Sequence, residues 1–145
     1  MATVFDVAAY ILAKRGEMTT WKLQKLVYYC QAWSLVWDEQ PLFHGRIEAW
    51  ANGPVCPDLY YRHRGQFRVS SIPEGDPEAL TLAQRETVDS VLDYYGNMNG
   101  QFLSDLTHAE RPWKETRDGI APGVNCNREI TSGLMADYYG SLPPD

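Results

Sequence analysis

Uncharged residues recur at helical spacing between Thr20 and Asp38, and this is the most regular stretch of the chain. The positions that follow the i, i+3, i+4, i+7 spacing of one helical face are Leu23, Leu26, Val27, Cys30, Ser34 and Trp37. Further aliphatic and aromatic residues widen this face until the second half is apolar nearly all round. A helix with such a pattern is surrounded by other elements. We therefore predict a buried central helix over residues 20–38, with Lys22 and Lys25 keeping one edge of its first turns polar.

Capping signals mark the starts of two further helices. Thr3 with Asp6, and Thr81 with Gln84, have the spacing of a capping box, in which two side chains satisfy the first free backbone N–H groups. Periodic apolar stripes and stop signals at Gly or Pro indicate several more. The predicted helices cover residues 3–15, 81–95, 101–109, 112–118 and 127–140 (the last capped by Asn127), with a short one from Pro54 or Pro57 through Tyr61.

Two short segments, residues 46–50 and 67–70, lack helical periodicity and are predicted to be short strands. The second is a candidate partner of the first. Asn52, Gly53 and Pro54 are residue types typical of turns, and a turn is predicted at these positions. Together the patterns predict a mainly α fold: a single compact helical domain over residues 1–145, built round the buried central helix, with a minor β element.

Composition and net charge limit the classes of partner that the chain is expected to bind. The length of 145 residues suits one domain with a real core, and the net charge of −6 disfavours nucleic acid or an anionic membrane as the main target. The chain also contains five Trp and nine Tyr. Such rings serve first as core packing, but those that lie exposed can act as anchors for a protein partner.

The three cysteines, Cys30, Cys56 and Cys126, are far apart and form no Cys-x-x-Cys pair, so neither a zinc ribbon nor a disulfide framework is predicted. A reducing, cytoplasmic location fits this pattern best. The first residues lack the basic segment of a secretory signal. No apolar run reaches the roughly 18 residues that a membrane span needs.

An enzymatic alternative depends on His108 and Glu110, with Cys126 as an added nucleophile. His108 and Glu110 are two positions apart, whereas a pair of zinc ligands on one helix face would be four apart. We expect no catalytic residue, no metal and no cofactor, and a polar role for His108 where one helix ends and the next begins. A small hydrolase-like or metal-dependent enzyme using His108 and Glu110 remains the alternative.

A second alternative is a nucleic-acid-binding protein of a mobile element. Residues 60–68 interleave aromatic rings with Arg62, Arg64 and Arg68, which is a weak nucleic-acid signature. On an acidic chain, a solvated helix end or a surface for an acidic protein partner explains the same residues.

Four strings of residues together resemble one protein family. They are Lys22–Tyr29, Pro41–Phe43, Glu48–Val55 and Leu106–Trp113, and they occur in the order typical of the Panacea domain, or SocA-like antitoxin family, of bacteria and prophages. The resemblance implies a mainly helical domain that acts by binding protein. It implies an antitoxin that neutralises a cognate toxin of a toxin–antitoxin system by direct binding, or as an adaptor that delivers the toxin to a protease.

The expected partners are thus a cognate toxin and a protease, with no membrane. Large rigid side chains dominate interface energies, so exposed rings are the first candidates for contact. The residues predicted to bind the partner are Trp50, Asn52, Tyr60, Tyr61, His108, Glu110 and Trp113. An acidic surface would suit a basic toxin.

Overall fold

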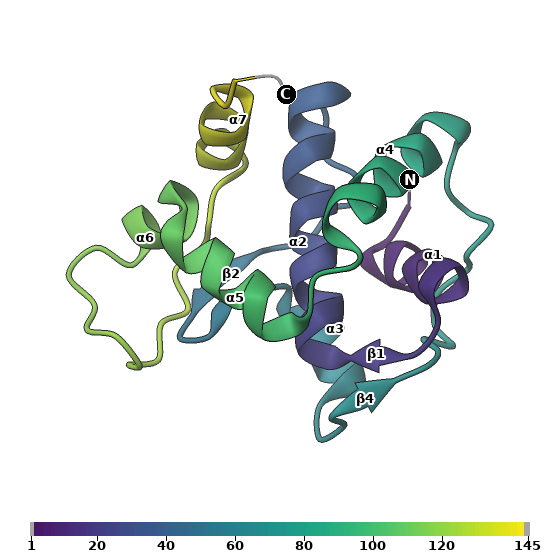
Figure 1. Cartoon of the computed structure of the whole chain (residues 1–145), viewed down its shortest axis with the longest axis horizontal. Coiled ribbons are helices and arrows are strands. Elements are labelled where there is room, and N and C mark those ends of the chain that lie inside the picture. Colours follow the sequence, from purple (N-terminus) through teal and green to yellow (C-terminus); the bar gives the residue numbers. More distant parts are fainter. Residues whose placement is uncertain (1, 144–145) are drawn as a thin grey trace.

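The computed structural model describes residues 2–143, which form seven helices and two small two-stranded sheets (Figure 1). The helices are α1 (Val4–Arg15), α2 (Thr20–Trp37), α3 (Pro57–His63), α4 (Leu82–Tyr95), α5 (Gly100–Ala109), α6 (Arg111–Thr116) and α7 (Ser132–Gly140). The strands are β1 (Met18–Thr19), β2 (Glu48–Trp50), β3 (Gly53–Val55) and β4 (Arg68–Val69). The prediction of a mainly α fold is confirmed.

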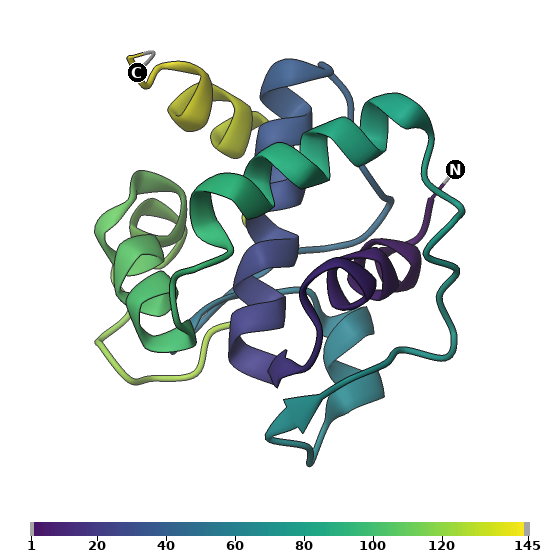
Figure 2. The ribbon, with the colours of Figure 1, turned by 45° about the vertical axis from the view of Figure 1, so that its right-hand side comes forward.

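Helix α2 stands at the centre, and α1, α4, α5 and α7 pack around it. Figure 2 shows α4 crossing α2 while α7 lies beside its C-terminal end. Leu23, Leu26, Val27 and Cys30 are completely buried. The predicted buried central helix is therefore confirmed, with Asp38 as its C-cap.

The last turn of α2 departs from this prediction. Trp37 is 49% exposed, although its spacing placed it on the buried face. Its ring stacks on the half-buried Trp33 with centroids 4.9 Å apart, so only one of its faces is covered. The apolar stripe continues into the final turn of α2. There the ring of Trp37 faces solvent and not a neighbouring helix, and it is therefore only half covered.

The capping boxes predicted from the sequence are both present. Thr3 and Asp6 begin α1, and Thr81 and Gln84 begin α4, each pair with reciprocal hydrogen bonds between side chain and backbone. The start of the last helix was predicted wrongly. Thr131 caps α7, because residues 127–130 instead run extended beside β2, where Ala49 N–H donates to Arg128 O and Ile130 N–H to Ile47 O.

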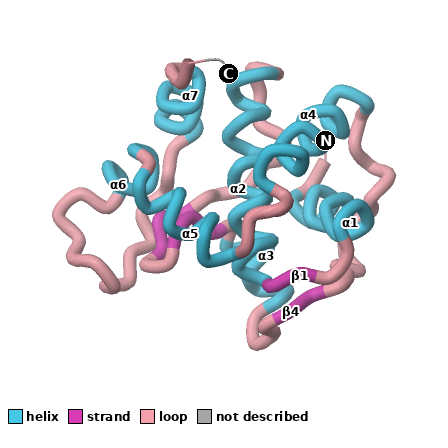
Figure 3. Tube along the Cα trace, viewed as in Figure 1, coloured by secondary structure: helices cyan, strands magenta, loops and turns pink. Residues whose placement is uncertain are grey.

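The two predicted strands exist, but their predicted pairing with each other is wrong. β4 pairs with β1 in one place, and β2 pairs with β3 in another, as the magenta segments of Figure 3 show. A turn at Ala51 and Asn52 folds β2 onto β3, so Gly53 and Pro54 belong to a strand and not to the predicted turn. Pro54 is tolerated because β3 is an edge strand, which needs fewer N–H donors.

Tyrosines form much of the core around α2. Tyr28, Tyr29, Tyr95 and Tyr139 are buried, whereas Tyr94 on α4 is 60% exposed beside Tyr95. Most neighbouring rings meet edge to face, for example Tyr28 and Tyr29 with centroids 5.3 Å apart, whereas Tyr29 and Tyr95 stack with centroids 4.0 Å apart. None of the helices described between residues 2 and 143 combines the length and the apolar character that crossing a membrane requires.

Candidate functional site

A groove with a cavity volume of about 920 Å³ lies between the first half of α2, the β2–β3 hairpin and α3, with residues 125–127 also on its wall. We refer to it as the α2–α3 groove. This volume falls within the roughly 300–1,000 Å³ typical of ligand pockets. Its charged and aromatic lining residues are Trp21, Lys25, Glu48, Trp50, Tyr60, Tyr61, His63 and Arg64.

Four of the seven predicted partner-binding residues line this groove: Trp50, Asn52, Tyr60 and Tyr61. The ring of Tyr60 meets that of Trp50 edge to face with centroids 4.9 Å apart, and Tyr61 continues the row 5.8 Å from Tyr60. Tyr61 is 65% exposed, and the other two rings are half-buried. The three rings form an aromatic wall that is rigid at Trp50 and open to solvent at Tyr61.

The backbone of the hairpin is held from behind by side chains of α5, α6 and the residue after α6. Four successive carbonyl oxygens, those of residues 49–52, each accept one hydrogen bond. The donors, in that order, are Arg117, Trp113, His108 and Ser104, at 3.0, 2.8, 3.2 and 2.6 Å. The hairpin therefore presents Trp50 to the groove while its polar backbone is satisfied on the other side.

His108 and Trp113 belong to this support and do not line the groove. Their rings pack together with centroids 4.1 Å apart. Because His108 Nε2 faces the carbonyl oxygen of Ala51, that nitrogen carries the proton, and burial lowers the pKa of His108. A neutral His108 is thus a hydrogen-bond donor at the junction of α5 and α6.

Glu110 lies elsewhere, in the tyrosine core. Its Oε1 accepts hydrogen bonds from Tyr29 OH at 2.7 Å and from Tyr139 OH at 2.8 Å. Burial raises the pKa of Glu110, and these two hydrogen bonds oppose the rise. His108 and Glu110 therefore have different partners, and the structure does not bring them together as an acid–base pair.

Two of the three cysteines are buried and have thiols that resist ionisation. Cys30 and Cys56 are buried, and burial raises the pKa of Cys56 to about 11 and that of Cys30 further still. Cys126 lies half-buried in the groove wall. Within residues 2–143, no group of three or more His, Cys, Asp or Glu side chains is placed to hold a metal ion.

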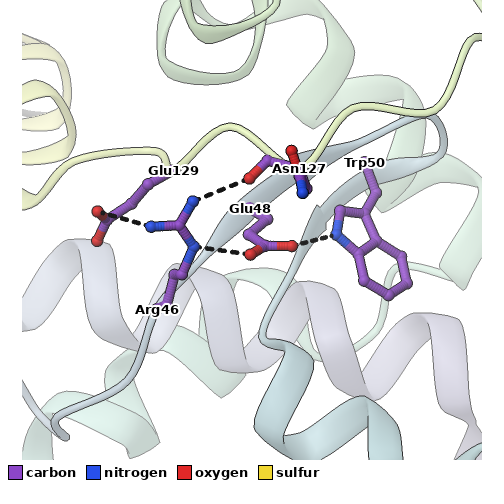
Figure 4. A network of polar contacts seen from close by, with 5 residues as sticks. All are labelled: Arg46, Glu48, Trp50, Asn127 and Glu129. Atoms are coloured by element: carbon purple, nitrogen blue, oxygen red, sulfur yellow. Dashed lines mark hydrogen bonds and ion pairs between the residues drawn. The ribbon is translucent and has the colours of Figure 1, made fainter.

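A polar network fixes the indole of Trp50 in the groove wall (Figure 4). Arg46 Nε donates to Glu48 Oε2 at 2.7 Å, and the other oxygen of Glu48 accepts from Trp50 Nε1 at 2.8 Å. Arg46 also bonds to Glu129 and to the backbone carbonyl of Asn127. Sequence reasoning missed Arg46 and Glu48, although the strand alternation at 46–50 places both on the same face as Trp50.

Lys25 is the third residue that sequence reasoning missed. It was expected on a polar edge of α2, yet it is only 2% exposed beneath the hairpin, where Nζ donates to Pro54 O at 3.2 Å. Burial lowers the pKa of Lys25 to about 7. Gly53 permits the close approach, because a Cβ there would lie 2.4 Å from Lys25 Cε.

Gln24 joins α2 to α3 at the groove floor. Its amide exchanges hydrogen bonds with the backbone of Cys56, and its Nε2 lies 2.9 Å from His63 Nε2. Since the amide nitrogen donates, His63 Nε2 accepts, and burial lowers the pKa of His63. The floor is thus neutral apart from Lys25.

The basic run of residues 60–68 is only partly available to a partner. Arg68 pairs with Glu17 at 2.8 Å, and Arg62 lies 3.8 Å from Glu74 and over the ring of Phe5. This pairing weakens the nucleic-acid alternative, because phosphate binding depends on unpaired Lys and Arg side chains.

One of the comparisons with known proteins identifies a family for this chain. A family model described as antitoxin SocA-like, Panacea domain matches residues 23–114, which is more than half of the chain. No curated protein and no solved structure matches the chain. The matched region spans α2, the hairpin, α3, α4 and α5, and reaches into α6. It therefore contains most of the groove and three of the four side chains that support the hairpin from behind, those of Ser104, His108 and Trp113.

Proposed function

This chain belongs to the SocA-like antitoxin, Panacea domain family, and we propose that it neutralises a cognate toxin by binding it directly. The toxin would be a protein of a bacterial or prophage toxin–antitoxin system. The observation that carries the proposal is the aromatic wall of the α2–α3 groove, made by Trp50, Tyr60 and Tyr61. Large rings fixed on secondary structure lose little entropy on binding and dominate protein interfaces.

The seven predicted residues divide into three roles in this proposal. Trp50, Asn52, Tyr60 and Tyr61 contact the toxin, since all four line the groove. His108 and Trp113 act one step behind, by holding the carbonyl oxygens of the hairpin. Glu110 stabilises the tyrosine core that carries the whole assembly.

We place the protein in a reducing cytoplasm as one domain. The three cysteines are free of disulfides, and one core cluster includes residues from Ala2 on one side to Tyr139 on the other. Direct blocking of the toxin is the first mode of action. Delivery of the bound toxin to a protease is the alternative, and the two differ in the lifetime of the toxin.

Expression with the product of the adjacent gene tests the proposal. The adjacent product alone should stop growth, and co-expression of this chain should restore growth and yield a complex that co-purifies. An adjacent product that is harmless alone would contradict the proposal for this protein. Immunoblotting of the toxin after synthesis is blocked separates the modes: a stable toxin indicates blocking, and a shortened half-life indicates delivery to a protease.

A His108→Gln variant separates binding from the enzymatic alternative. Gln keeps an N–H donor for the carbonyl oxygen of Ala51 but cannot act as a general acid or base. The antitoxin proposal expects growth rescue by this variant to match the unmodified chain. Loss of rescue in a variant with an unchanged circular dichroism spectrum would favour chemistry at His108.

A further inference from the structure

The charge of the α2–α3 groove is opposite to that of the chain as a whole. The chain has a net charge of −6, whereas two of the three charged side chains that line the groove are basic. These three are Lys25, Arg64 and Glu48. Both oxygens of Glu48 are occupied, since one accepts from Arg46, which also pairs with Glu129, and the other accepts from Trp50. The groove therefore offers two basic side chains, those of Arg64 and Lys25, and a carboxylate whose oxygens already accept hydrogen bonds.

Arg64 is the available cation at the rim. It follows the last residue of α3 and is exposed, and it makes no ion pair or hydrogen bond with other residues of the described range 2–143. Its neighbours Arg62 and Arg68 differ, because each faces a glutamate. A guanidinium can bind a carboxylate with two parallel hydrogen bonds.

Lys25 is the basic group at the floor of the groove. Its exposed fraction is only 2%. Among the described residues, the backbone oxygen of Pro54 is the one acceptor for its Nζ. An ammonium has three donors. Burial without an anionic partner disfavours the protonated form of Lys25, and a carboxylate that enters from the groove would favour that form.

Carboxamide side chains complete the lining. The members of this set, all exposed and all without a side-chain hydrogen bond to residues 2–143, are Asn52, Gln66, Asn125 and Asn127. Each carboxamide can both donate and accept, as the backbone of an extended peptide requires. The exposed rings of Trp21 and Tyr61, at 43% and 65%, lie in the same lining.

We propose that the α2–α3 groove binds an extended, acidic segment of the toxin, with an Asp or Glu side chain received between Arg64 and Lys25. The aromatic wall packs on the residues that flank this carboxylate, and the carboxamides bond to the backbone of the segment. This inference rests on the proposed function, because the toxin supplies the segment. It reverses the expectation from net charge, under which the partner surface would be basic.

The test uses the purified full chain and three short fluorescein-labelled peptides. In the first, Glu alternates with Val and Tyr; in the other two, Gln or Lys replaces every Glu. Fluorescence polarisation should show the Glu peptide binding at least about tenfold more tightly than the Gln and Lys peptides, since charge-assisted hydrogen bonds are about twice as strong as neutral ones. Equal binding of the Gln or Lys peptide, or binding of none, would overturn the inference.

Two variants with a matched control locate the binding. Arg64→Glu should abolish the preference for the Glu peptide, and Lys25→Met, checked for an intact circular dichroism spectrum, should reduce it. Arg85→Glu on α4, outside the groove, changes the net charge as much as Arg64→Glu and should leave binding unchanged. An Arg64→Glu variant that behaves like Arg85→Glu would place the peptide elsewhere and refute the assignment.

The outcomes distinguish this inference from the proposed function. If the chain rescues growth but the Glu peptide does not bind selectively, the acidic-segment inference fails and antitoxin activity stands. If the Glu peptide binds through Arg64 but the adjacent gene product is not neutralised, the antitoxin proposal fails while the charge preference of the groove stands.

Discussion

Trp113 donates its indole N–H to the backbone carbonyl oxygen of Trp50 across 2.8 Å, which connects two aromatic residues from opposite halves of the chain. The acceptor is the backbone of the residue whose ring forms the groove wall, and the donor lies behind the hairpin. His108 donates a similar hydrogen bond to the carbonyl oxygen of Ala51. The two contacts explain how the Thr-His-Ala-Glu-Arg-Pro-Trp string supports the groove from behind the hairpin. These residues position the site without lining it.

Removing this donor should weaken the hairpin. Trp113→Phe keeps an aromatic ring but loses the N–H, which removes the hydrogen bond to the carbonyl oxygen of Trp50. We expect the free energy of unfolding to fall by about 0.5–1.5 kcal/mol, measured by urea denaturation. Trp37→Phe is the control, because Trp37 is 49% exposed and its indole N–H has no acceptor among residues 2–143. Equal losses in both variants would contradict a specific role for the Trp113 hydrogen bond.

Gly53 should not tolerate a side chain. Its φ is +122°, and a Cβ would lie 2.4 Å from Lys25 Cε, so Gly53→Ala must distort the hairpin or displace Lys25. We expect a loss of roughly 1–3 kcal/mol in the free energy of unfolding from backbone strain alone. Gly133→Ala in α7 is the control, since nothing lies within 4 Å of its Cβ position and Ala favours helix. A Gly53→Ala variant as stable as the control would mean that the close packing on Lys25 is absent.

Lys25 should make stability depend on pH. Its pKa is about 7 in the folded protein and 10.5 when exposed, so between these values the unfolded chain holds a proton that the folded chain has lost. The free energy of unfolding should therefore rise with pH across this window, by up to about 1.4 kcal/mol per pH unit. Urea denaturation of the unmodified chain and of Lys25→Met at pH 7, 8 and 9 measures this, since the variant lacks the contribution. Parallel curves would show that Lys25 stays protonated when folded.

Tyr61 should contribute to toxin binding and not to folding. Its side chain is 65% exposed in the groove wall, so Tyr61→Ala should leave the free energy of unfolding nearly unchanged. Affinity for the toxin should fall by about tenfold or more, as expected for a central aromatic anchor. Tyr94→Ala is the matched control, because Tyr94 is 60% exposed on α4 and does not line the groove. Isothermal titration calorimetry with the purified toxin gives both affinities, and a larger loss for Tyr94→Ala would move the interface to α4.

The helices were largely predictable because their signals are local. The capping boxes at Thr3 and Thr81 use pairs three residues apart, and the apolar stripe of α2 depends on neighbours within two turns. The four strings together indicated the family for a similar reason, because they can be read without knowing what they contact. Asn127 misled the prediction because it is a good cap residue, but hydrogen bonds to β2 hold the segment extended.

The sequence by itself determined that this chain folds as helices around Thr20–Trp37, and which residues would cap α1 and α4, because these preferences act over a few residues. Only the tertiary structure decided that Lys25 is buried beneath Gly53, that Trp50 and Tyr60 share one groove, and that His108 and Glu110 face different partners. Those relationships join residues that are tens of positions apart. The packing of whole elements selects them, since a short helical pattern shows which face is polar but not what will cover it.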